Sequence, residues 1–338
     1  MKILGLGNAL VDVLSKLDSD ETLVKIGIQK GAMDMISREQ MYVIRKYQAN
    51  TETTQAPGGA NCNTMRAIAL LGGQSGFIGK VGDDNLGQFY EEALLKAGVA
   101  SYLIKTEGPS GACTVFISPD GERTMGTFLG PAPTISPDEI MEDVLRNYDC
   151  IHIEGYLIVN EELVRETMKK AKRLGLKVAL DLANYNIVNA YKGLLEEVIP
   201  QYVDILFANA NEAEAFTGLP AQEAVKALEK QVHVALVTLG KDGSLIGSEG
   251  KFYHVDAEGG KPVDTTGAGD NFAAGFLYGQ SVGASLVQSA QIGSMLSGYV
   301  IDVVGPQVPA DKWEQIKLKV KTIFCLLYTS DAADDRIS

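Results

Sequence analysis

The sequence predicts an α/β fold of three layers, in which helices flank a mainly parallel central sheet and a small β-sheet forms a lid. Three observations support this prediction. Apolar runs alternate with amphipathic helical patterns along much of the chain, two separate regions (11–37 and 101–128) carry short strand patterns instead, and 46% of the 338 residues are hydrophobic. A chain of this length and composition can bury a large core, either in one domain with insertions or in two domains.

The first half of the chain predicts buried strands and amphipathic helices around the two regions of short strands. Apolar runs predict strands at 1–6 and 77–81, and apolar residues at helical spacing predict helices at 61–71 and 86–97. Inside the first region, 25–28 and 32–36 alternate in the manner of small strands. Strands from the two regions can pair into one sheet above a site, although ordinary edge hairpins would have the same pattern.

From residue 150 onward the alternation of strands and helices becomes regular. This regularity predicts βαβ units and therefore a parallel sheet, whose strands are apolar throughout because both faces are buried. The predicted strands are 150–153, 177–180, 205–207 and 234–238, and the predicted helices are 161–174, a helix near Leu194, and 221–230. We expect one domain over 1–324, with lid inserts at about 11–37 and 101–128. We expect residues 325–338, which show no periodicity, to be a disordered or non-native tail.

Composition excludes several classes of function. The formal net charge of −13 without a basic stripe argues against nucleic-acid binding. No apolar run approaches the roughly 20 residues that cross a bilayer, and the apolar start is interrupted by Asp12, unlike a signal peptide. The four cysteines form no CxxC pair and the three histidines are scattered, so a zinc site is not expected. These features predict a cytoplasmic protein with a small-molecule substrate and no membrane partner.

The segment from Asp264 to Asp270 carries the strongest chemical pattern. Residues 262–263 read as the end of a strand, and a helix is predicted at 272–278. The unbulky Gly267-Ala268-Gly269 can bring backbone N–H groups close to an anion at the helix N-terminus, with Asp270 beside it as a base. A phosphoryl group in transfer needs both features. A purely structural turn, with Asp270 capping the helix dipole, would have the same residues.

The position of Asp270 also predicts its basicity. A helix N-terminus lowers the pKa of a carboxyl group, so we expect Asp270 to be an ionised but weak base. A weak base suffices where the attacking hydroxyl becomes acidic late in the transition state. Other phosphate-binding patterns are missing. The sequence has no GxxxxGK[ST], and Leu10 stands where a dinucleotide fingerprint after Gly5 and Gly7 needs its third glycine, which argues against a dehydrogenase.

Six motifs in order give the chain a resemblance to the ribokinase-like (PfkB) carbohydrate and nucleoside kinases, over residues 3 to 309. The segment Gly58-Gly59-Ala60-Asn61-Cys62-Asn63 and the segment Asp264 to Asp270 are similar to the N-terminal and C-terminal signatures of that family. The other four matches are Leu71-Gly72-Gly73, 78–87, Asn211-Glu212-Ala213-Glu214 and 238–243. The resemblance implies the ribokinase-like fold and ATP-dependent phosphorylation of a primary hydroxyl.

The resemblance also implies roles for particular residues. Asp270 would be the catalytic base, and Gly267, Ala268 and Gly269 would form the anion hole. The acceptor would be bound by Asn8, Asp12, Gly58, Gly59 and Asn63, and the nucleotide by Asn211, Thr238, Gly240, Gly243, Gly267 and Gly269. Glu214 would hold Mg2+ through water, whereas Glu212 also reads as an ordinary first-turn acid. Backbone carbonyls at Asp264 and Thr266 are placed for K+. Ala290, Gly293 and Ser297 suit an adenine pocket or helix packing equally.

The sequence favours adenosine as the acceptor. The start of the chain and the 121–130 segment resemble adenosine-kinase-like bacterial members, and Met33, Met35 and Phe116 are apolar groups that can cover a purine. A fructokinase- or ribokinase-type sugar kinase is the alternative, and a catalytically silent binding protein is the non-enzyme alternative. Arg123 can reach a substrate or phosphate from the lid, or form a surface ion pair. Both a monomer and a lid-mediated homodimer agree with the sequence.

Overall fold

The computed structural model describes residues 1–259 and 262–325. In this part of the chain a large sheet has nine strands, and all neighbouring strands pair in parallel except in the last two pairs at one edge, which are antiparallel. In spatial order they are β14 (Lys251–Val255), β13 (Ser244–Ser248), β12 (Val234–Thr238), β11 (Ile205–Asn209), β10 (Lys177–Asp181), β9 (Cys150–Ile153), β1 (Ile3–Leu6), β5 (Ser75–Gly82) and β6 (Ala100–Thr106).

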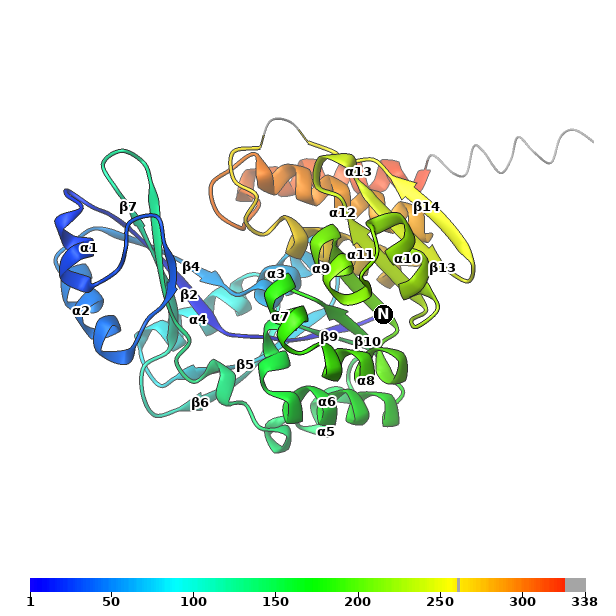
Figure 1. Ribbon diagram of the computed structural model, residues 1–338, viewed down its shortest axis with the longest axis horizontal. Coiled ribbons are helices and arrows are strands. Elements are labelled where there is room, and N and C mark those ends of the chain that lie inside the picture. Colours follow the sequence, from blue (N-terminus) through cyan, green and yellow to red (C-terminus); the bar gives the residue numbers. More distant parts are fainter. Residues whose placement is uncertain (260–261, 326–338) are drawn as a thin grey trace, which may run out of the picture.

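Helices cover both faces of this sheet and complete three layers (Figure 1). Ile3 of β1 packs on one face, and its neighbours Leu4 and Leu6 pack mainly on the other, which explains the unbroken apolar run. The first face is covered by α3 (Ala60–Leu71), α4 (Asn85–Lys96), α11 (Ala268–Ser281), α12 (Leu286–Ile301) and α13 (Trp313–Cys325). The second is covered by α5 (Glu142–Leu145), α6 (Glu161–Arg173), α7 (Tyr185–Ala190), α8 (Lys192–Tyr202), α9 (Ala210–Thr217) and α10 (Ala221–Glu229).

A smaller, separate sheet lies beside the large one. Its strands, in spatial order, are β3 (Met33–Met35), β8 (Arg123–Phe128), β7 (Gly111–Ile117), β2 (Leu10–Lys16) and β4 (Thr53–Gly58). Two helices, α1 (Glu21–Ile26) and α2 (Arg38–Gln48), lie at the left of Figure 1 and bury Phe116 of this sheet among their own apolar residues. Strands of both predicted regions pair here, so they are not ordinary edge hairpins.

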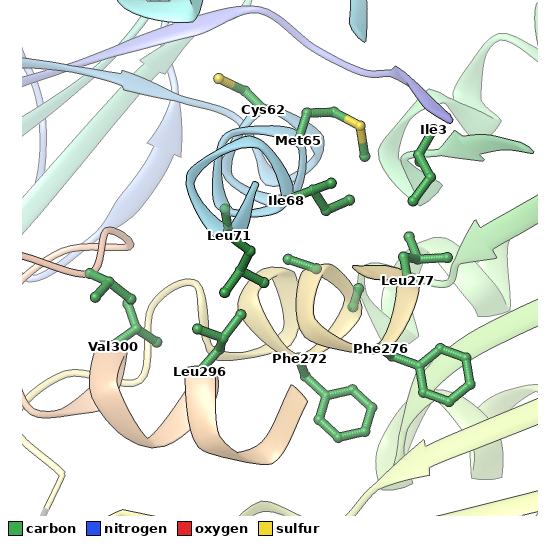
Figure 2. Close-up of a cluster of buried hydrophobic side chains, with 14 of the residues drawn as sticks. Ile3, Cys62, Met65, Ile68, Leu71, Phe272, Phe276, Leu277, Leu296 and Val300 are labelled. Carbon is green, nitrogen blue, oxygen red and sulfur yellow. The ribbon is translucent and has the colours of Figure 1, made fainter. Parts of the chain in front are cut away.

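Helix α11 is the central element of the first face. It packs between α3 and α12, with its apolar side chains in the cluster that Figure 2 shows. That cluster includes Met65, Ile68, Phe272, Phe276 and Leu296. The tight packing against α12 depends on glycine, because a Cβ at Gly275 would lie 2.6 Å from the Cα of Gly293. Helix α11 is therefore packed closely between α3 and α12.

The fold class is confirmed, and several local predictions are wrong. Residues 25–28 are not a strand, because Leu23 and Ile26 bury one face of α1 and the left-handed Gly27 ends that helix. Strand β4, with the polar sequence TTQAPG, was not predicted. Strand β6 lies in the large sheet, outside the second insert.

Two further predictions concern the later part of the chain. Residues 262–263 do not end a strand, since β14 ends at Val255 and Pro262 to Gly267 form turns and bends. Cys325 belongs to α13, and the rest of the predicted tail, residues 326–338, lies outside the described residues. Within the described ranges, every helix is too short or too polar to span a bilayer.

Candidate active site

The start of α11 presents two backbone donors and a carboxyl group on one turn. Gly267 is the N-cap residue with φ of 77°, and a Cβ at this position would lie 2.6 Å from the Cβ of Pro306, so the turn requires glycine. Within the described residues, the N–H groups of Gly269 and Asp270 donate to no protein acceptor, whereas that of Ala268 donates to Thr265. Nothing lies within 4 Å of a Cβ built on Gly269. Helix ends of this kind bind anions.

Asp270 is held in place by the start of α3. Nδ2 of Asn63 donates to its Oδ2 at 2.9 Å, and Oγ1 of Thr64 donates to its backbone oxygen at 3.1 Å. Thus two of the predicted motifs, separated by about two hundred residues, meet directly. The Oδ1 atom of Asn63 is buried without a partner in the described residues, which leaves one acceptor beside the carboxyl group of Asp270.

The predicted acceptor-binding residues also lie together. Asp12 is on β2 opposite Ala56 of β4, and a Cβ at Gly58 would lie 2.5 Å from its carboxylate, so Gly58 makes room for Asp12. Gly59 has φ of 91° and comes so close to Asn8 that a Cβ would lie 2.2 Å from its backbone oxygen. These close contacts explain both glycines without any ligand.

Glu154 was missed by the sequence reasoning. It directly follows β9 and is buried, where Nδ2 of Asn8 donates to it at 2.7 Å and the backbone N–H of Asn61 at 3.2 Å. These bonds hold Asn8 by its amide nitrogen and leave Oδ1 of Asn8 buried without a partner in the described part of the chain. The available signal was position, since polar residues follow the carboxyl ends of neighbouring parallel strands.

Several carboxyl groups lie near the carboxyl ends of the parallel strands, and burial raises their pKa values. Burial raises the pKa of Asp12, Glu154 and Glu212 to about 7 and that of Asp181, the last residue of β10, to about 6. Burial raises the pKa of Asp270 to about 8, and the neighbouring carboxylates Asp181, Glu154 and Asp12 add to the rise. The prediction of a lowered pKa for Asp270 is therefore wrong. Loss of hydration outweighs the helix dipole.

The residues predicted to bind the nucleotide and magnesium lie at the carboxyl ends of the next strands, β11 and β12. Asn211 and Glu214 are exposed on α9. Glu212 is buried in a capping box with Asn209, which agrees with its interpretation as an ordinary acid of the first helical turn. Thr238 ends β12 beside Asn209, and Gly240 and Gly243 follow with φ of 60° and 87°. No group of three acidic, histidine or cysteine side chains in the described residues forms a preassembled metal site.

Other predicted residues have different surroundings. Ala290 and Gly293 are buried in the packing of α12 against α11, and Oγ of Ser297 donates to the backbone oxygen of Ala268 at 2.7 Å. Phe116 is fully buried beneath α1 and α2, on the face of the second sheet opposite Asp12, so it cannot cover a ligand there. Arg123 pairs with Asp264 at 2.9 Å, and Thr266 donates twice to Oδ1 of Asp264.

Comparisons with known proteins concern the family and the fold of the chain. The model of the pfkB family carbohydrate kinases matches residues 20–313. The adenosine kinase of Saccharomyces cerevisiae is 30% identical over 334 residues, which cover 91% of this chain and 96% of the yeast protein.

Solved structures show the same relationship. An adenosine kinase from Sinorhizobium meliloti superposes with a TM-score of 0.79 and 32% identity, covering 91% of this chain and 96% of that one. A probable sugar kinase from Rhizobium etli superposes with a TM-score of 0.81 and 31% identity, covering 94% and 98%.

Proposed function

Because the chain belongs to the pfkB family of carbohydrate kinases, phosphotransferases that act on a hydroxyl group, we propose that it transfers the γ-phosphate of ATP to the primary hydroxyl of a ribonucleoside, with adenosine favoured. The observation that carries the proposal is the position of Asp270. Its carboxyl group shares one helical turn with the N–H groups of Gly269 and Asp270 itself, which donate to no acceptor among the described residues. A base and an anion site are thereby adjacent.

In the proposed reaction the acceptor lies between the two sheets. Asp12 and the Oδ1 atoms of Asn8 and Asn63, which have no partner in the described part of the chain, accept hydrogen bonds from its hydroxyl groups. Asp270 takes the proton of the primary hydroxyl, and Asn63 orients the carboxyl group of Asp270. The N–H groups at the start of α11 stabilise the transferring phosphoryl oxygens. The oxygen of the acceptor thus forms a bond to phosphorus as the bond to ADP breaks.

Mg2+ is proposed to arrive with ATP. Carboxylates and water are its preferred ligands, and it commonly binds through one or two carboxylates and the substrate phosphates. Exposed Glu214 with Asn211 would hold its water ligands, and the crowded carboxyl groups of the sheet edge favour a cation nearby. The ion would neutralise charge on the phosphates.

The inner face of the second sheet supports a nucleoside over a sugar. The pairing register places Leu14, Val115, Met125 and Met33 in one row, on the same face as Asp12 and next to the row with Met35. Met33 and Met35 are 76% and 63% exposed. An apolar face opposite the site suits a flat heterocyclic base, whereas a sugar offers mainly hydroxyl groups. The match to a probable sugar kinase keeps sugars as the second candidate.

A panel of acceptors tests the proposal. ADP release is measured for wild type and Asp270→Asn with purine and pyrimidine nucleosides, ribose and fructose. We expect turnover to be highest with adenosine and to fall about 10²- to 10⁴-fold in the variant. Absence of turnover with every acceptor, or an equally active variant, would refute the kinase proposal.

A second experiment tests the nucleoside preference. The double variant Met33→Gln, Met35→Gln should raise KM for the nucleoside, whereas Val24→Gln on α1, whose side chain is 80% exposed, is the matched control and should not. A higher turnover with fructose or ribose than with any nucleoside would favour the sugar-kinase alternative.

A further inference from the structure

The carboxylate of Asp264, three residues before Gly267, has a full set of donors. Its Oδ2 accepts from Nη1 of Arg123 and from the N–H of Gly305, both at 2.9 Å. Its Oδ1 accepts from the N–H of Thr266 at 3.0 Å and from Oγ1 of Thr266 at 2.7 Å. A carboxylate has about four acceptor positions, so these four bonds use all of them.

The guanidinium of this cluster comes from a distant part of the fold. Arg123 is the first residue of β8 in the second sheet, and Asp264 lies in the segment that leads into α11. The two residues are 141 positions apart in the chain, and the Asp264 side chain is only 11% exposed. A cation on one sheet therefore neutralises an anion in the segment that positions Gly267, Ala268 and Gly269.

This arrangement does not suit the K+ ion that the family resemblance implies on the backbone carbonyl oxygens of Asp264 and Thr266, because the Asp264 carboxylate beside those oxygens is already paired with Arg123. The carboxylate has no acceptor position left for an ion, and its charge is already balanced. A second cation on the neighbouring carbonyl oxygens would lie close to the guanidinium without an anion of its own. The residues present thus supply a fixed positive charge where a monovalent ion would otherwise be needed.

We propose that Arg123 is a tethered internal cation, whose guanidinium replaces a monovalent ion at the 264–267 segment and makes phosphoryl transfer independent of K+. The inference rests on the proposed kinase function. Arg123 is a positioning residue in this role, because it orders the amide groups at the start of α11 through Asp264. The second sheet and the anion site are coupled as a result.

The activity of ion-exchanged enzyme is the first test. In buffers of equal ionic strength, replacing K+ by tetramethylammonium should change wild-type kcat less than about twofold. Arg123→Ala should lose about tenfold to hundredfold in tetramethylammonium, as loss of a charge-assisted hydrogen bond predicts, and should recover with K+ or guanidinium. Lys30→Met is the matched control, because Lys30 pairs with Asp20 of its own insert and with Asp120 of the second insert, and its loss should leave the ion response unchanged.

Thermal melting is the second readout and needs no turnover. Arg123→Ala should gain a K+-specific rise in Tm that wild type lacks, and Arg123→Gln, which keeps most of the stem, serves if the alanine variant does not fold. This result stands even if no acceptor is phosphorylated. Two outcomes would overturn the inference: wild type activated tenfold or more by K+, or a folded variant that neither K+ nor guanidinium restores. The second would assign Arg123 to direct contact with a phosphate or acceptor.

Discussion

Asn63 donates a hydrogen bond of 2.9 Å from its side-chain amide to Asp270, and this bond joins the start of α3 to the start of α11. Both helices begin at a glycine with positive φ, Gly59 and Gly267. The bond connects the turn beside the acceptor residues to the turn that presents backbone amides. The carboxyl group of the proposed base therefore has a defined orientation before any substrate binds.

The activity should increase with pH because Asp270 must be ionised to accept a proton. Burial raises its pKa to about 8 in the free protein, so the protonated form predominates at neutral pH. We expect kcat/KM to rise about tenfold per pH unit below this value and to level off above it, since kcat/KM reports the free enzyme. The pH profile of ADP release measures this. A profile that is flat between pH 6 and pH 9 would contradict it.

Two alanine variants on the same turn separate structure from binding. Gly267→Ala should lower both Tm and kcat, because φ is 77° and the new Cβ would lie 2.6 Å from Pro306. Gly269→Ala has open space and a helical position, so Tm should be retained or raised. The reason is that alanine favours the helix over glycine by about 1 kcal/mol in free energy.

If the amides bind phosphate, Gly269→Ala should still lose activity, because its methyl group projects into the space left for the anion. Melting curves together with ATP kinetics distinguish the two variants. Full activity in Gly269→Ala would be inconsistent with an anion hole at this turn.

Asp12→Ala should weaken the acceptor and leave ATP almost unaffected. Asp12 belongs to the second sheet and its carboxylate lies against Gly58, whereas the phosphates are proposed to bind the backbone N–H groups at the start of α11. Loss of hydrogen bonds to a charged group predicts an increase in acceptor KM of about tenfold to hundredfold. Initial-rate kinetics with each substrate varied in turn measure this, with Asp34→Asn on the exposed strand β3 as the control. Equal increases for both substrates would place Asp12 elsewhere.

Glu154 should position Asn8 without touching substrate. Glu154→Gln keeps the size but puts an amide donor among the N–H groups of Asn8 and Asn61, so we expect acceptor KM to rise about tenfold with little change in kcat. Glu154→Ala should instead destabilise the fold by about 1–3 kcal/mol for each donor left unpaired. KM, kcat and Tm of the two variants are compared. An unchanged KM in a folded Glu154→Gln variant would exclude the positioning role.

The sequence alone was enough for the features that local patterns encode. Apolar runs placed the parallel strands β1, β5, β9, β10, β11 and β12 but not β6, and helical spacing placed α3, α4, α6 and α10 within a few residues. The glycines before Asp270 predicted a helix N-terminus with available amides, and the N–H group of Gly269 donates to no acceptor within the described residues. These predictions hold because strand burial, helix periodicity and glycine turns depend on neighbours in the chain.

Only the tertiary structure decided the features that depend on distant segments. It placed the polar strand β4 in the second sheet, although no apolar periodicity in the sequence indicates a strand there, and it buried Glu154 against Asn8. It also reversed the expected pKa of Asp270, because the hydration that a carboxyl group loses is set by every element around it. The pairing of Arg123 with Asp264 is likewise invisible in sequence, since two charges 141 residues apart meet only after both sheets have formed.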